Sequence, residues 1–121
     1  MYEVKLYPNN EKALINKLLD DFEKSGNPKY YRDFNIYINK LKEFGLEMNK
    51  KFKRDSFKRL EEDMYELRPK DFRIMFTFKD NEFIIMNGFL KKGQETPKEE
   101  MERARKCIKK IINRWFYYQN L

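Results

Sequence analysis

Residues 65–90 read YELRPKDFRIMFTFKDNEFIIMNGFL, and this stretch decides the fold. Apolar residues alternate on both sides of a turn at Pro69–Phe72, and Asp80-Asn81 is typical of a second hairpin turn. We therefore predict antiparallel strands at about 63–68, 72–79 and 83–90. The unusual feature is a pair of permanent positive charges, Arg68 and Arg73, inside the first hairpin.

Pairing the first two strands across the Pro69–Phe72 turn places Arg68 opposite Arg73 and Leu67 opposite Ile74. Because side chains alternate along a strand, Leu67 and Ile74 face the predicted helices and the arginines face the other way. Like charges at facing positions destabilise a strand pair. An anion between them would relieve this repulsion, and a guanidinium is well shaped to bind a phosphate.

The third strand ends in GFLKKG, residues 88–93. Continuing the antiparallel pairing places Gly88 beside Arg73 and Lys91-Lys92 beside the turn that follows Arg68. The sequence thus predicts a cluster of cations of the size of a phosphate site at one end of the sheet. Each charge also has an ordinary explanation as a solvated surface residue, with Glu66 or Asp71 neutralising the arginines.

The flanking segments predict helices and one more strand. Residues 2–7 alternate and stop at Pro8, Asn9 or Asn10 can cap a helix, and residues 25–28, SGNP, separate it from a second helix ending at Gly45. Thr96-Pro97-Lys98-Glu99 is a capping box for a C-terminal helix. The apolar face of that helix comprises Met101, Ala104, Ile108, Ile111, Ile112 and Trp115. We predict a single α+β domain over residues 1–121, a small antiparallel β-sheet packed against an N-terminal helical hairpin and the C-terminal helix.

Between Gly45 and Arg59 the periodicity loosens and the charge becomes basic, so we expect a loop or a short irregular strand. This segment carries cations that could steer a nucleic acid, or simply be solvated: Lys50, Lys51, Lys53 and Arg54. The rings of Phe72 and Phe89 lie near the predicted cationic end of the sheet. Aromatic residues of strands are usually core residues, but either ring could stack on a base.

Composition narrows the functional classes. The 121 residues include 27 Lys+Arg and 20 Asp+Glu, a net charge of +7 that indicates a polyanionic partner. The chain has no His and a single cysteine, which excludes an intrachain disulfide and His-based catalysis, so we expect no metal site and no cofactor. No segment approaches the roughly 18 apolar residues of a membrane span. We expect a reduced, cytoplasmic protein without a membrane partner.

Four segments, in their order and spacing, resemble the RelE/HigB-like toxins of bacterial type II toxin–antitoxin systems, in particular the branch akin to phage-derived proteins. They are Tyr65–Arg68, Arg73–Phe76, Gly88–Lys92 and Thr96–Ala104. The resemblance is close over residues 60–110 and holds elsewhere only in the order of elements. It implies a RelE-like α+β fold, ribosome-dependent cleavage of mRNA, and neutralisation by a cognate antitoxin, commonly a helix-turn-helix protein.

The family's basic site residues carry over to Arg68, Arg73, Lys91 and Lys92. For an endoribonuclease, we expect Arg73 to stabilise the pentacovalent phosphate, Arg68 to assist, and Lys91 and Lys92 to bind phosphate or transfer a proton. Some relatives have His or an acidic residue near the site, and the absence of His leaves the proton acceptor unassigned.

Two functional classes stay open at this point. The first is the endoribonuclease toxin, with mRNA, the ribosome and an antitoxin with an acidic contact segment as partners. The alternative is a non-catalytic RNA- or partner-binding module, either a degenerate toxin or a phage-derived protein that uses the basic face for docking. An antitoxin-like or structural phage component is disfavoured, because the sequence lacks a helix-turn-helix pattern.

Overall fold

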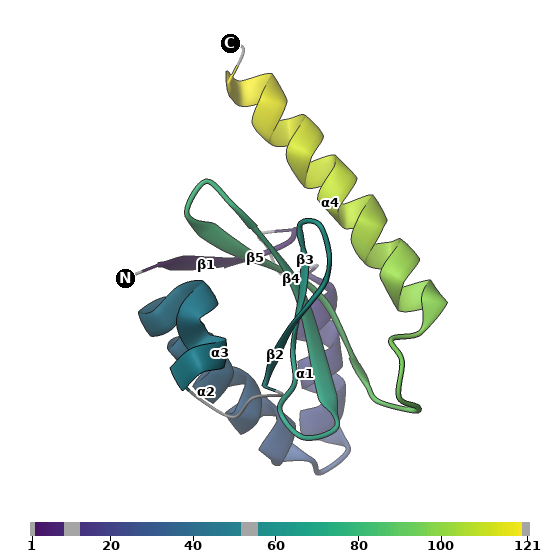
Figure 1. Cartoon of the computed structure of the whole chain (residues 1–121). Coiled ribbons are helices and arrows are strands. Elements are labelled where there is room, and N and C mark those ends of the chain that lie inside the picture. Colours follow the sequence, from purple (N-terminus) through teal and green to yellow (C-terminus); the bar gives the residue numbers. More distant parts are fainter. Residues whose placement is uncertain (1, 9–12, 52–55, 120–121) are drawn as a thin grey trace.

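The computed structural model describes residues 2–8, 13–51 and 56–119 (Figure 1). Over these residues the chain forms a five-stranded sheet in the order β1-β5-β4-β3-β2. Helices α1 and α2 cover one face of the sheet and α4 covers the other. The predicted α+β class is confirmed.

The elements are β1 (Glu3–Leu6), α1 (Leu14–Lys24), α2 (Pro28–Phe44), the 3₁₀ turn η1 (Gly45–Glu47), α3 (Met48–Lys51), β2 (Phe57–Glu61), β3 (Met64–Leu67), β4 (Phe72–Lys79), β5 (Glu82–Leu90) and α4 (Lys98–Gln119).

Both central hairpins form, and the first has the predicted register. In the first, Leu67 pairs with Ile74 and Tyr65 with Phe76. In the second, Asp80 and Asn81 have positive φ values of 51° and 65°, which a two-residue type I′ turn requires. Alternation therefore predicts the register of β3 against β4, and turn chemistry predicts the hairpin between β4 and β5.

The pairing of β4 with β5 differs from the prediction by one residue near the arginines. Gly88 pairs with Ile74, and Phe89 is the residue beside Arg73. The register shifts between Ile74 and Phe76, where β5 contains one more residue than β4. Such a bulge locally bends a strand and redirects its side chains, and it leaves no clear signal in an alternating sequence.

Two strands differ from the expected sheet. β1 runs parallel to β5, so the sheet is mixed rather than wholly antiparallel. β2 starts in the segment expected as a loop or short irregular strand and continues two residues beyond it, and the second alternative is confirmed there: β2 is a short edge strand that pairs with β3, with a register shift between Arg59 and Glu61. Its exposed Lys58 and Arg59 hide the strand pattern in the sequence, although charged side chains are common on edge strands.

The predicted helical hairpin is confirmed by α1 and α2, whose apolar sides share one core with the sheet. Gly45 ends α2 at a positive φ of 59°. A Cβ atom at this position would lie 2.5 Å from Cε2 of Tyr2, whose ring packs edge-on against Phe83 at 5.5 Å between centroids. Asn9 and Asn10, the predicted caps of the first helix, lie outside the described residues.

The second core lies between α4 and the other face of the sheet. Ala104, Ile108 and Ile111 of α4 pack there with three buried methionines, Met64, Met75 and Met86. The helix starts one residue later than the capping box predicted, because the carbonyl of Pro97 accepts the first helical hydrogen bonds. Ile112 lies at the exposed margin of this face, and the side chain of Trp115 is outside the described part of the structure.

Replacing Gly45 tests how tightly α2 ends against the N-terminal strand. Gly45→Ala should lower the free energy of unfolding by about 2 kcal/mol or more, since it adds backbone strain to a steric clash with Tyr2. Gly26→Ala is the matched control, because Gly26 also has a positive φ but open space around it. Its cost should be about 1 kcal/mol. Equal losses for both variants in urea denaturation would show that the Tyr2 contact contributes nothing.

Candidate functional site

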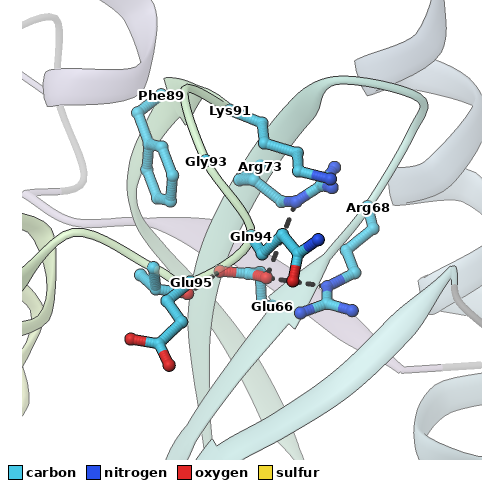
Figure 2. Close-up of a pocket in the computed structure, with 9 residues that line it drawn as sticks. Glu66, Arg68, Arg73, Phe89, Lys91, Gly93, Gln94 and Glu95 are labelled. Atoms are coloured by element: carbon cyan, nitrogen blue, oxygen red, sulfur yellow. Dashed lines mark hydrogen bonds and ion pairs between the residues drawn. The ribbon is translucent and has the colours of Figure 1, made fainter.

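A shallow pocket lies where β3, β4 and β5 end, beside the loop that leads into α4 (Figure 2). It contains about 180 Å³, including its solvent-open part. As an enclosed space it holds little more than one water-sized group, so a ligand would lie across its mouth rather than inside it. The lining residues are Glu66, Arg68, Arg73, Phe89, Lys91, Gly93, Gln94, Glu95 and Thr96.

Glu66 lies at the floor of this pocket, and its side chain is only 1% exposed. Its Oε1 accepts a hydrogen bond from Nε of Arg68 at 2.8 Å and lies 3.7 Å from Nε of Arg73. Its Oε2 accepts a hydrogen bond from the Thr96 hydroxyl at 2.9 Å. A buried carboxylate is costly unless it is paired, and here two guanidinium groups and a hydroxyl satisfy it. Glu66 thus joins β3, β4 and the loop before α4 (Figure 2).

Arg73 is the most firmly held cation of the pocket. Its Nη1 donates to the carbonyls of Lys70 at 2.7 Å and Phe72 at 3.1 Å. Burial lowers the pKa of Arg73 and the charge of Arg68 adds to this, whereas Glu66 opposes it. An arginine nevertheless stays protonated in proteins. The guanidinium is therefore a permanent charge whose orientation is fixed before any ligand binds.

Both arginines keep donors that face the pocket. Within the described residues, no partner occupies Nη2 of Arg73 or either Nη of Arg68. Lys91 lies on the same side, and its backbone amide donates to the carbonyl of Asp71 at 2.7 Å, which fixes the chain beside the first hairpin turn. The free N–H groups of the arginines and the ammonium group of Lys91 line the same pocket, so they can bind one anionic group together.

The structure brings together three of the four predicted catalytic residues, namely Arg68, Arg73 and Lys91. Lys92 is exposed and does not line the pocket. The repulsion expected between the facing arginines is relieved by Glu66. This agrees with the alternative given above, in which an acidic neighbour neutralises the arginines. Glu66 does not close the pocket, since it contacts both arginines through Nε, which leaves Nη2 of Arg73 and both Nη atoms of Arg68 without a partner among the described residues.

Comparison with known proteins identifies the family. The family model for phage-derived Gp49-like proteins matches residues 4–109 of the chain. The chain belongs to this family. Gp49-like proteins are associated with toxin–antitoxin systems, which implies an antitoxin as partner. No curated protein matches the chain.

The two predicted stacking rings lie in different environments in this Gp49-like protein. Phe72 is fully buried, with its ring edge-on to Phe22 and Tyr30 at 5.5 and 5.7 Å between centroids. It cannot stack on a base, contrary to the prediction, because strand alternation places it on the face opposite Arg73. Phe89 is partly buried and lines the pocket beside Arg73, so it stays a candidate for base stacking.

The basic segment of residues 50–54 does not extend the pocket. Lys50 is exposed on α3, whose Met48 belongs to the core shared with α1 and α2, on the opposite face of the sheet. Figure 1 accordingly shows α3 away from the loop that precedes α4. The side chain of Lys51 is not described, and Lys53 and Arg54 lie outside the described residues. A role for these four residues in binding RNA stays a prediction.

Sequence reasoning missed two residues that organise the pocket. Glu66 was considered only as an exposed counter-ion, and Thr96 only as a helix cap. The alternation of β3 already places Glu66 on the same face as Arg68, so a buried carboxylate could have been inferred there. The contact between Thr96 and Glu66 joins positions 30 residues apart, and no local pattern predicts it.

Two further observations concern membrane-spanning helices and the reactivity of the cysteine. No described helix has the length and the apolar character needed to cross a membrane. Cys107 is partly buried in α4, and burial raises the pKa of its thiol. Because a thiolate rather than a thiol is the nucleophile, this environment does not activate Cys107.

Removing the carboxylate of Glu66 should destabilise the protein. We expect Glu66→Ala to lower the free energy of unfolding by about 3 kcal/mol, the low end for removing one partner of a buried ion pair, because both arginines keep some exposure. Glu61→Ala is the matched control, since Glu61 makes an exposed ion pair with Arg105. That variant should lose less than about 1 kcal/mol. Chemical denaturation measures both, and similar losses would contradict the central role of Glu66.

Proposed function

We propose that this Gp49-like protein is the toxin of a type II toxin–antitoxin system and cleaves mRNA on the ribosome. The observation that carries the proposal is the pair of oriented guanidinium groups, Arg68 and Arg73, with free N–H groups at the mouth of a shallow, open pocket. The family's association with toxin–antitoxin systems agrees with it. The proposed place of action is the cytoplasm, where mRNA is translated.

The reaction we propose is attack of an RNA 2′-hydroxyl on its own 3′-phosphate. The bond from O2′ to phosphorus forms and the bond from phosphorus to O5′ breaks, which leaves a 2′,3′-cyclic phosphate and a 5′-hydroxyl. The 2′-hydroxyl loses its proton and the departing O5′ gains one, so atoms and charge balance. The transition state places extra negative charge on the non-bridging phosphate oxygens, and oriented donors stabilise that charge.

The residues divide the task as follows. Arg73 donates through Nη2 to a phosphate oxygen, and Arg68 adds its outer nitrogens. Lys91 is exposed at the rim and supplies the proton to O5′ or a further positive charge. Lys92 lies outside the lining and contributes at most to attraction of the RNA. Glu66 is a poor candidate for the base, because it is buried and both of its oxygens already accept hydrogen bonds.

The open pocket explains why this chemistry would depend on the ribosome. A shallow surface does not hold a flexible RNA in the geometry for in-line attack, whereas the ribosome presents mRNA in an ordered path. Positioning of this kind supplies a large share of the rate enhancement of many enzymes. The net charge of +7 favours association with ribosomal RNA, and it equally favours an antitoxin with an acidic contact segment, for which a helix-turn-helix protein is our proposal.

One observation favours the second candidate, a non-catalytic binding module. Of the two carboxylates that line the described pocket, that of Glu66 is fully engaged and that of Glu95 is exposed and points away from the two arginines (Figure 2), so neither is placed as a base beside them. Such a protein would bind RNA or a partner through the same arginines without breaking a bond. Primer extension on cellular mRNA after induced expression separates the two functions, since new 5′ ends appear only if the RNA is cut.

We expect Arg73→Lys to abolish growth arrest upon induced expression in bacteria. Lysine keeps a positive charge near Glu66 but lacks the planar group with several donors, and loss of one oriented donor costs roughly 100- to 1,000-fold in rate. Arg59→Lys, on the exposed edge strand β2, is the matched control and should stay toxic. Soluble level and melting temperature are measured for both variants. An Arg73→Lys protein that is as toxic as the parent would refute the assignment of the phosphate site.

A further inference from the structure

The outer side of α4 is a second basic surface, separate from the pocket. The inner side of this helix packs on the sheet through Ala104, Ile108 and Ile111. From Arg103 to the end of the helix every charged residue is basic. Three exposed lysines occupy the side away from the sheet at helical spacing, and we call them the α4 lysines: Lys106, Lys109 and Lys110.

Two of the α4 lysines, Lys109 and Lys110, have no acidic residue one helical turn away, whereas Lys106 lies one turn after Glu102. The neighbouring arginines are paired, Arg105 with Glu61 and Arg103 with Glu100. Over the described residues, by contrast, the α4 lysines make no ion pair and no hydrogen bond. Like charges three and four residues apart on a helix repel one another. A surface of this kind is stabilised by an external polyanion.

The helix dipole does not account for this cluster. It favours acidic residues in the first turn, where α4 has Glu99 and Glu100, and cations in the last turn. The α4 lysines lie more than two turns before the end of the helix at Gln119, beyond the reach of that effect.

The α4 lysines and the pocket lie on the same side of the sheet. α4 starts just after Thr96, which binds Glu66 in the pocket, and it then runs along the sheet and past it (Figure 1). At a rise of about 1.5 Å per residue, the α4 lysines lie roughly 12–18 Å along the helix from its start. That length corresponds to about four or five phosphates of one nucleic-acid strand. One RNA can therefore contact both surfaces.

We propose that the α4 lysines bind the phosphate backbone of folded RNA and hold the substrate complex on the protein. The identification of the polyanion as RNA rests on the proposed function. The surface itself favours RNA over an acidic protein, because lysine is depleted from the cores of protein interfaces, which are rich in aromatic residues. The other described residues of this side near the lysines are Asn113, which is polar, and Glu102, whose carboxylate lies at the end nearer the start of the helix and offsets part of the charge of Lys106.

The test compares two triple variants that remove the same charge. In the first, the α4 lysines are replaced as Lys106→Gln, Lys109→Gln and Lys110→Gln. In the second, exposed cations of the helical hairpin on the opposite face of the sheet are replaced as Lys17→Gln, Lys24→Gln and Arg32→Gln. Binding of a fluorescein-labelled RNA hairpin to the full-length protein is measured by anisotropy at a series of salt concentrations.

We expect the α4 triple variant to lower the salt dependence, the slope of log K against log salt, by about 2–3, with a loss of affinity of about tenfold or more at physiological salt. The control triple should change the slope by less than about 1. Equal changes in both variants would overturn the proposal and leave only an effect of net charge. Unchanged RNA binding together with lost binding of a polyglutamate peptide would overturn it in favour of an acidic protein.

The binding assay is independent of cleavage. Arg73→Lys should change the salt slope by less than the α4 triple variant, because it retains the charge. If Arg73→Lys stays toxic while the α4 triple variant loses RNA affinity, the proposed catalytic site fails and the docking surface stands. If the α4 triple variant binds RNA as the parent does while Arg73→Lys loses toxicity, the docking surface fails alone.

Discussion

The carboxylate of Glu66 is the interaction on which the pocket depends. It is almost completely buried, and its two oxygens receive one hydrogen bond from Arg68, an ion pair from Arg73 and a hydrogen bond from Thr96. Without it, two guanidinium groups at neighbouring positions of paired strands would repel each other. With it, the same charges become fixed donors, and Nη2 of Arg73 and both Nη atoms of Arg68 keep no partner among the described residues. A pocket of several cations is stable here because its floor is an anion.

The same face of the sheet also determines where α4 lies. Besides the contact between Thr96 and Glu66, the buried amide of Asn87 donates to Glu100 at 2.7 Å, so two polar contacts hold the first turns of the helix on the sheet. The methionine core beneath gives this contact a flexible apolar surface, whereas the core under α1 and α2 is built from interlocking aromatic rings. The two layers thus use different packing, and the pocket opens next to the methionine core.

Local patterns in the sequence predict the hairpins well, since alternation and the Asp80-Asn81 turn determine register within a few residues. They predict the meeting of Arg68, Arg73 and Lys91 for the same reason. Local patterns do not predict features that depend on residues far apart in the sequence or on a single extra residue in a strand. The parallel pairing of β1, the extra residue in β5 and the burial of Phe72 against α1 and α2 all depend on tertiary packing. Glu66 is an intermediate case. Alternation predicts on which face of the sheet its side chain lies, but it does not predict that the side chain is buried.

The parallel pairing of β1 with β5 has a consequence for synthesis of the chain. Glu3 pairs with Glu82, so the first strand has no partner until most of the polypeptide has left the ribosome. The Thr96 hydroxyl, which completes the floor of the pocket, emerges later still. Contacts between residues so far apart form late in folding. A nascent or truncated chain that ends before the loop into α4 therefore lacks an assembled pocket, and any activity of the pocket begins only with a nearly complete molecule.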